Sequence, residues 1–139
     1  MAHQTLENPI VLRVARPTNN LATITRMYME ALGFELLGSF ENHDGIDGAM
    51  VGRRDHQYHL EFTFRRDSAA RSSPDREQLL VFYVPDLTEW TTSCERMVAA
   101  GFKRVTSDNP FWDIAGQTFA DIDGCRVVLQ RAAWTHESS

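Results

Sequence analysis

The chain reads Leu12-Arg13-Val14, then a segment of helical spacing over residues 19–32, and then Gly33-Phe34. The same pattern returns as Phe82-Tyr83-Val84, residues 87–100 and Gly101-Phe102. A later strand-like stretch, Tyr58-His59-Leu60-Glu61-Phe62, is matched in the same way by Arg126-Val127-Val128-Leu129-Gln130. The elements recur at an offset of about 67–70 residues, half the chain, which predicts one supersecondary unit used twice.

Each copy is predicted to be a βαβββ unit. In the first copy, residues 9–16 alternate as a strand and residues 19–32 form a helix that Thr18 or Asn19 caps and Gly33 closes. Three strands follow over residues 34–40, 48–53 and 57–64, with an Asp44-Gly45 turn between the first two.

The second copy begins with a strand over residues 79–84 and a helix that Asp86 or Thr88 caps. The predicted buried stripe of this helix is Trp90, Cys94, Met97 and Val98, and strands follow over residues 102–106, 117–120 and 125–131. We therefore expect one domain with units at residues 9–64 and 78–131. Residues 65–77 form a polar linker, and residues 132–139 form a tail.

The composition is that of an ordinary globular protein. The 139 residues, 42% hydrophobic and 24% charged, suffice for a single core. A net charge of −5 argues against a general nucleic-acid binder, which needs a surplus of Lys and Arg. The two cysteines have no metal-type spacing and do not suggest a disulfide framework, and the second point favours a cytoplasmic location. No apolar run is long enough to span a membrane.

The motifs, taken in order, resemble those of the vicinal oxygen chelate superfamily, which contains glyoxalase I, the bleomycin-resistance proteins and the extradiol dioxygenases. They are Ala31-Leu32-Gly33-Phe34, His59-Leu60-Glu61, Val84-Pro85-Asp86-Leu87 and Phe119-Ala120-Asp121-Ile122-Asp123-Gly124. The resemblance covers the chain from Pro9 to Arg131. It implies an α+β fold in which two tandem βαβββ units form curved mixed sheets that enclose a cavity, commonly within a homodimer.

The resemblance also implies where a metal ion would bind, and here the chain departs from the family. Metal-dependent members use four strand positions, two from each unit, which correspond to Pro9, Glu61, Leu79 and Val128 in this sequence. Only Glu61 can ligate a divalent ion, whereas a catalytic site ordinarily needs about three protein ligands. We therefore expect no cofactor, with a divalent metal held by Glu61 and His59 as the less favoured alternative.

Strand alternation predicts the lining of the cavity independently of the family. If Leu12 and Val14 pack on the first helix, then Arg13 faces the cavity, and His59 and Glu61 join it from their own strand. The second copy and the aromatic loop at residues 109–113 supply equivalent candidates. The predicted ligand-binding residues are Arg13, His59, Glu61, Tyr83, Trp112, Arg126 and Gln130.

Several of these residues allow more than one role. Arg13 and Glu61 can neutralise each other as a partly buried ion pair, or Arg13 or Arg126 can bind a carboxylate or phosphate of a ligand. His59 can be a structural residue, a general base oriented by Glu61, or a metal ligand together with His43 or His56. Trp112 can plug the mouth of the cavity, with Trp134 at the same rim, or stack on a flat ligand.

These observations leave three functional hypotheses. The first is a metal-independent protein that binds and sequesters a small molecule, as in the bleomycin-resistance branch. The second is a lyase, isomerase or dioxygenase that uses Glu61 and His59, with or without a divalent metal. The third is a protein whose cavity is filled by its own side chains and whose dimer surface is the functional part. The expected partners are a small-molecule ligand and a second copy of the chain, without nucleic acid or membrane.

Overall fold

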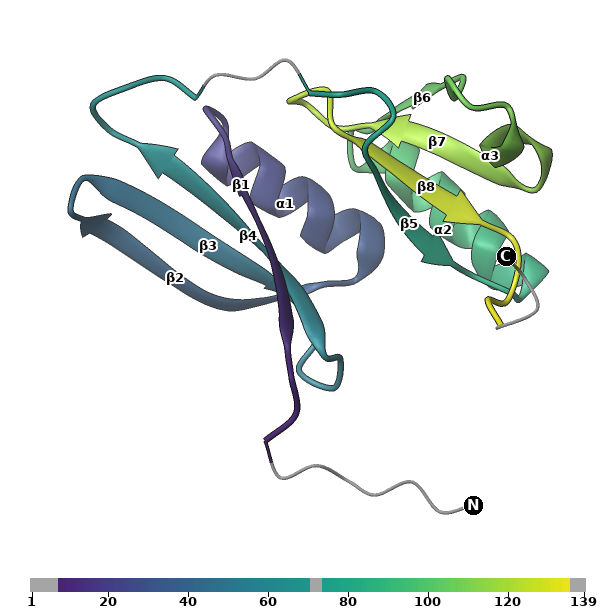
Figure 1. The fold of residues 1–139 in the computed structure, drawn as a ribbon, viewed down its shortest axis with the longest axis horizontal. Coiled ribbons are helices and arrows are strands. Elements are labelled where there is room, and N and C mark those ends of the chain that lie inside the picture. Colours follow the sequence, from purple (N-terminus) through teal and green to yellow (C-terminus); the bar gives the residue numbers. More distant parts are fainter. Residues whose placement is uncertain (1–7, 71–73, 136–139) are drawn as a thin grey trace.

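The structure, a computed structural model, describes residues 8–70 and 74–135, and it contains two βαβββ units in succession (Figure 1). Unit 1 consists of β1 (Leu12–Pro17), α1 (Leu21–Leu32), β2 (Glu35–His43), β3 (Ile46–Gly52) and β4 (Tyr58–Arg65). Unit 2 consists of β5 (Leu79–Tyr83), α2 (Leu87–Ala99), β6 (Lys103–Val105), α3 (Phe111–Ile114), β7 (Gly116–Ala120) and β8 (Arg126–Gln130). The predicted α+β fold with tandem units is confirmed.

The two sheets have the same topology. Their strand orders are β1-β4-β3-β2 and β5-β8-β7-β6, and in each sheet the first and last strands of the unit pair in parallel while the other pairs are antiparallel. The register places Arg13 opposite His59 in unit 1 and Leu79 opposite Arg126 in unit 2. One supersecondary unit has therefore been used twice, as the sequence repeat predicts.

The helix ends follow local chemistry. Gly33 adopts a left-handed conformation (φ 66°) at the end of α1, which suits a residue without a Cβ atom. The Asp86 side chain caps α2 by accepting a hydrogen bond from the Glu89 backbone N–H at 2.8 Å. The predicted cap of α1 is wrong by one or two residues. Asn20 holds the N-cap position, and Thr18 Oγ1 instead accepts a hydrogen bond from the Asn20 N–H.

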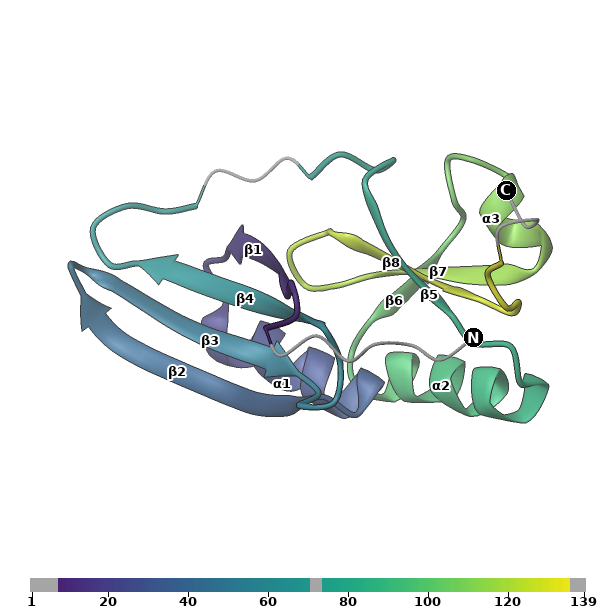
Figure 2. The same ribbon diagram turned by 60° about the horizontal axis from the view of Figure 1, so that its bottom comes forward.

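The two helices lie side by side in one layer, and each covers one face of its own sheet (Figure 2). Between and beneath them is a single core to which both units contribute. Its largest side chains include Tyr28, whose ring packs 5.1 Å from the rings of both Phe62 and Phe102. The units are therefore joined on the helix side of their sheets.

Two predictions about the helix-facing residues are wrong. Leu12 and Val14 are 61% and 36% exposed, because β1 is the edge strand of its sheet and α1 packs on β3 and β4 instead. Val98 is 57% exposed because the buried stripe of α2 runs through Cys94 and Met97 and leaves Val98 on the flank. The loop predicted at residues 109–113 contains a short helix, α3.

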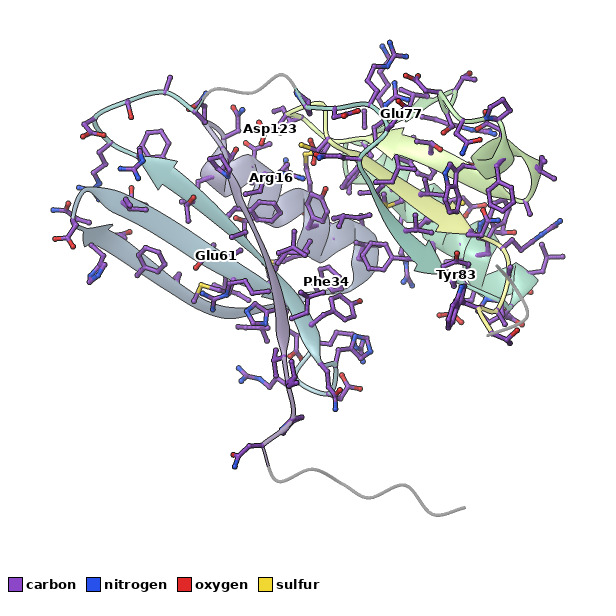
Figure 3. All side chains as sticks on the ribbon, in the orientation of Figure 1. Arg16, Phe34, Glu61, Glu77, Tyr83 and Asp123 are labelled. Carbon is purple, nitrogen blue, oxygen red and sulfur yellow. The ribbon has the colours of Figure 1, made fainter. Side chains whose placement is uncertain are left out.

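A buried polar cluster centred on Asp121 of unit 2 connects the two units by hydrogen bonds from residues of unit 1. Arg16 Nη2 donates to Asp121 Oδ2 at 2.6 Å, and the Tyr28 hydroxyl donates to the same oxygen at 2.7 Å. The backbone N–H groups of Asp123 and Cys125 satisfy the other carboxylate oxygen. Burial raises the pKa of Tyr28 far above its usual value, so its hydroxyl remains a donor. Figure 3 shows Arg16 and Asp123 near each other at this junction.

Candidate ligand-binding site

The face of each sheet that points away from its helix is called here its open face. On the open face of unit 1, strands β1 and β4 place Arg13, His59 and Glu61 side by side, because their side chains alternate with the helix-facing Leu60 and Phe62. Arg13 Nε donates to His59 Nε2 at 2.9 Å, and Arg13 Nη1 donates to Glu61 Oε2 at 3.1 Å. The predicted ion pair between Arg13 and Glu61 is confirmed.

This Arg13 cluster, made of Arg13, His59 and Glu61, is open to a ligand. The Arg13 side chain is 47% exposed, whereas that of Glu61 is only 13% exposed. Because a guanidinium has five N–H donors, the two contacts leave three for another partner. His59 accepts the Arg13 N–H through Nε2, so the lone pair on that nitrogen, which a general base would need, is already occupied.

The open face of unit 2 is buried instead. Arg126, Val128 and Gln130 on β8 are all buried. The segment 106–115 runs beside this face, with Thr106 bonded to Arg126 and α3 in contact with β7. Arg126 Nη1 donates to the Thr106 carbonyl at 3.1 Å and lies 3.6 Å from Asp108. Within the described residues, the buried Gln130 Oε1 and Thr118 Oγ1 have no hydrogen-bond partner. We call the segment 106–115 the cover of unit 2.

Trp112 belongs to this cover. Its ring is half-buried and packs edge-to-face with Phe111 at 5.0 Å, while Phe111 itself is exposed. The backbone of Trp112 lies against Gly116, where an added Cβ atom would come within 2.7 Å of the Trp112 carbonyl oxygen and 2.4 Å of Gln130 Oε1. Gly116 therefore lets the cover approach the sheet.

Tyr83 is separated from the Arg13 cluster. It lines a cleft of about 640 Å³ between the units, together with His56 and Tyr58 of unit 1 and Arg96 of unit 2. Figure 3 shows Tyr83 and Glu61 on different units and well apart. Within one chain, the predicted site residues therefore fall into three separate places. Arg13, His59 and Glu61 lie together on unit 1, and Trp112, Arg126 and Gln130 belong to the covered face of unit 2. Tyr83 lies in the cleft between the units.

The residues at the family's metal positions do not fit a divalent ion. Pro9 precedes β1, and Leu79 and Val128 are hydrocarbon side chains. No three His, Cys, Asp or Glu side chains gather to hold a metal anywhere in residues 8–70 and 74–135. His43 and His56 instead contact the rings of Phe40 and Tyr58, at 6.3 Å and 5.4 Å between centroids.

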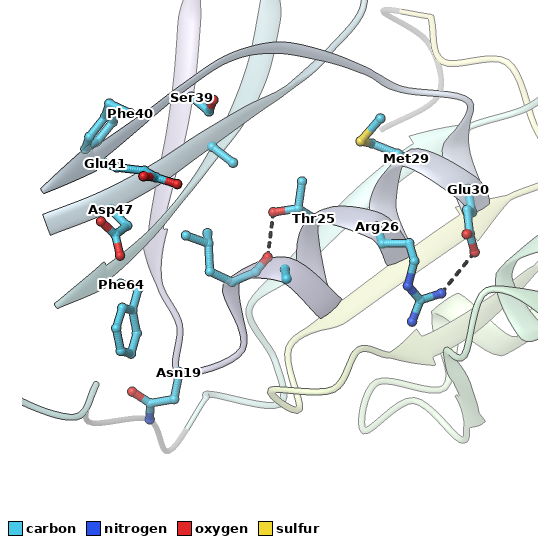
Figure 4. Close-up of a pocket in the computed structure, with 14 residues that line it drawn as sticks. Asn19, Thr25, Arg26, Met29, Glu30, Ser39, Phe40, Glu41, Asp47 and Phe64 are labelled. Carbon is cyan, nitrogen blue, oxygen red and sulfur yellow. Dashed lines mark hydrogen bonds and ion pairs between the residues drawn. The ribbon is translucent and has the colours of Figure 1, made fainter. Parts of the chain in front are cut away.

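A further cavity of about 650 Å³ lies on the opposite face of the first sheet, between α1 and strands β2 and β3 (Figure 4). Its lining includes Phe64 and Met29 with the carboxylates of Glu30, Glu41 and Asp47. Glu30 is paired with Arg26, and Asp47 with Arg66. Unit 2 has an equivalent hollow of about 480 Å³ beside α2. Both cavities therefore arise because each helix is narrower than the sheet on which it packs.

Sequence reasoning did not predict Asp108, Thr118 or Gly116. Strand alternation puts Thr118 on the same face as Val128, its partner in the register, and that signal was present in the sequence. The roles of Asp108 and Gly116 depend on the path of the cover, for which the sequence has no periodic signal.

Comparisons with known proteins agree with this architecture. A model of the YycE-like N-terminal domain matches residues 12–63, and a model of the YycE-like C-terminal domain matches residues 77–131. The chain is 39% identical over 121 residues to the uncharacterised protein YycE of Bacillus subtilis (strain 168), and the match covers 87% of each chain. A crystal structure of a YycE protein of unknown function from Bacillus subtilis superposes with a TM-score of 0.85 and 37% identity, covering 91% of this chain and 93% of that one.

More distant structures share the fold alone. The fosfomycin resistance protein FosX from Mesorhizobium loti superposes with a TM-score of 0.67 and 14% identity, covering 96% of this chain and 98% of that one. TnmS3, an antibiotic-binding protein from Streptomyces sp. CB03234, superposes with a TM-score of 0.59 and 18% identity, covering 91% and 98%. In the described part of the chain, no helix is both long and apolar enough to cross a membrane. The chain belongs to the YycE-like family of the vicinal oxygen chelate superfamily.

Proposed function

We propose that this protein binds and sequesters a small molecule without a metal ion, and that the ligand is held by the Arg13 cluster on the open face of unit 1. The observation that carries the proposal is the half-exposed Arg13 guanidinium, oriented by His59 and Glu61 and with N–H donors to spare. Guanidinium geometry suits a carboxylate, phosphonate or phosphate group, or a carbonyl oxygen. The ligand is therefore proposed to carry such a group.

The same contacts argue for binding rather than catalysis. A general base needs a free lone pair, and that of His59 is occupied by the Arg13 N–H. The negative charge of Glu61 is likewise compensated by Arg13 at 3.1 Å. A lyase, isomerase or dioxygenase using these two residues would first have to displace Arg13 from both.

We further propose that a second copy of the chain completes the site. The edge strand β1 and the residues before it expose a row of apolar side chains, from the 88% exposed Ile10 through Val11 and Leu12. Exposed, apolar edge strands commonly pair with another chain, and larger apolar patches mark interfaces. Arg13 lies on this same strand, with His59 and Glu61 beside it on β4, so a homodimer formed here would enclose the ligand. Leu12→Lys is expected to shift the protein from dimer to monomer in sedimentation velocity, while Val98→Lys, on the exposed flank of α2, leaves the assembly unchanged.

Two further points support the proposal. The fold is used for binding in TnmS3, an antibiotic-binding protein, and for fosfomycin resistance in FosX. Both cysteines are free, and burial raises the pKa of Cys94 to about 11 and that of Cys125 above its usual value, so neither is an activated nucleophile. Free thiols fit the proposed cytoplasmic location.

The test is a thermal-shift and calorimetric titration of metal-free protein with fosfomycin, which carries a phosphonate, and with bleomycin, which is cationic. A ligand that binds only the native state must raise the melting temperature by mass action. We expect fosfomycin or a related anion to stabilise the wild type, and Arg13→Ala to abolish the shift. Arg26→Ala is the control, because Arg26 is also exposed, at 56%, but pairs with Glu30 on α1, away from the Arg13 cluster. Binding that survives Arg13→Ala, or that requires added metal, would contradict the proposal.

A further inference from the structure

We propose that the junction between the two units contains a second binding site, for a small carboxylate with an apolar body. The site is a cavity of about 190 Å³ whose polar lining is Arg16, Gln78, Cys125 and Arg126. It lies on the helix side of β1 and β4, the opposite face from the Arg13 cluster, and does not depend on the function proposed above.

The walls of the cavity come from both units. Val14, Leu60 and Phe62 form the side from unit 1, and Leu79 and Leu80 of β5 form the side from unit 2. All are hydrocarbon or aromatic side chains, so the cavity favours an apolar group between them. An apolar cavity of about 150 Å³ is large enough for benzene, so a ligand with one ring fits this volume.

The polar lining consists mainly of hydrogen-bond donors. Arg16 Nη2 donates to Asp121 Oδ2, and the guanidinium lies 5.1 Å from the centre of the Phe62 ring. Its Nε is buried and has no hydrogen-bond partner among the described residues. A buried donor without an acceptor is costly, and a carboxylate oxygen in the cavity would relieve that cost.

Arg126 and Gln78 add further donors. The Arg126 side chain is more than nine-tenths buried, and among the described residues its contacts run through Nη1, to the Thr106 carbonyl at 3.1 Å and to Asp108 at 3.6 Å. Two guanidinium groups that face one small apolar cavity match the planar, two-oxygen geometry of a carboxylate. An aromatic monocarboxylate such as benzoate combines the required charge, size and apolar body.

The experiment is a titration of the full-length protein with benzoate, followed by NMR chemical shifts and by calorimetry, with neutral benzamide as the matched probe. Benzoate is expected to bind with a dissociation constant on the order of 1 mM or tighter, a plausible affinity for a ligand of about nine heavy atoms. Benzamide should bind at least tenfold more weakly. Benzoate should also slow the alkylation of Cys125 by iodoacetamide, because this thiol lines the same cavity.

Two variants locate the site. Val14→Phe adds a ring at the partly exposed wall and should weaken benzoate binding at least tenfold, with circular dichroism confirming the fold. Arg16→Lys keeps the charge beside Asp121 but removes Nε, and should weaken binding severalfold. Arg13→Ala removes the proposed ligand group on the other face, so benzoate should still slow the alkylation of Cys125 in this variant. Equal binding of benzamide, undiminished binding in Val14→Phe, or loss of this protection of Cys125 in Arg13→Ala would overturn the proposal.

Discussion

The two βαβββ units share one strand order, but the open face is exposed in unit 1 and covered in unit 2. In unit 1 a two-residue turn, Asp44-Gly45, joins β2 to β3, and both residues have positive φ angles of 52° and 81°, as this hairpin requires. In unit 2 the corresponding connection is the ten-residue cover, residues 106–115, and β6 is only 3 residues long. Unit 1 therefore exposes Arg13, whereas unit 2 buries Arg126 and Gln130.

In this protein one connection decides whether the open face of a sheet is exposed or is covered by a loop. The strand order is the same in both units, so the difference in exposure does not come from the topology of the sheets. The exposed half of the duplication is the one that we propose receives the ligand. The covered half also contains Asp121, which joins the two units through its hydrogen bonds with Arg16 and Tyr28.

The largest expected effect concerns the turn before the last strand of each unit. Asp121→Ala removes a buried carboxylate that accepts from Arg16, Tyr28 and two backbone N–H groups, and is expected to lower the free energy of unfolding by about 3–5 kcal/mol. The control is Asp55→Ala in the corresponding turn of unit 1, where Asp55 is exposed and no measurable change is expected. Urea denaturation of both variants measures the difference, and equal losses would contradict the asymmetry between the units.

The next effect tests how closely the cover lies on the second sheet. Gly116→Ala would bring a methyl group within 2.7 Å of the Trp112 carbonyl, a backbone atom that cannot turn aside. Overpacking of this kind is expected to cost about 1–3 kcal/mol. At Gly38 in unit 1 an added Cβ meets only the flexible Met50 methyl at 2.9 Å, so Gly38→Ala should cost less. A larger drop in melting temperature for Gly38→Ala than for Gly116→Ala would mean that the cover does not pack closely on Gly116.

The smallest effect has opposite signs in the two units. Among the described residues the buried Thr118 Oγ1 has no hydrogen-bond partner, so Thr118→Val is expected to leave stability unchanged or raise it by up to about 1 kcal/mol. Thr25 Oγ1 in unit 1 donates to the Leu21 carbonyl at 2.7 Å, so Thr25→Val should lower stability by about 1 kcal/mol. The pair of substitutions is measured by denaturant titration. A clear loss in Thr118→Val would mean that this hydroxyl has a partner after all.

Much of the fold could be predicted from the sequence because the repeat supplies the same evidence twice. Period-two alternation in β1 and β4 correctly places Arg13, His59 and Glu61 on one face, since neighbouring strands share a pleat. Alternation also puts Arg126 and Gln130 on the equivalent face of unit 2. It does not tell whether a helix is wide enough to cover an edge strand, which is why the expected packing of Leu12 and Val14 on the first helix is wrong.

The remainder of the site depends on contacts distant in sequence. The cover has no hydrophobic period, and its path is fixed by Arg126 reaching back to Thr106 and by the space at Gly116. The Asp121 cluster was visible only as a turn motif, because Arg16 and Tyr28 meet it from the other unit across about a hundred residues of chain. Such partners become apparent only once the two units are packed together.

The most direct test of the central claim, a binding site that works without metal, is elemental analysis of the untagged protein. The protein is analysed before and after equilibration with zinc, nickel, manganese and ferrous iron, alongside Glu61→Ala. We predict that no metal is retained and that the wild type and the variant are indistinguishable in metal content. About one retained metal ion per chain, lost in Glu61→Ala, would contradict the account and point to a metal-dependent enzyme built around Glu61.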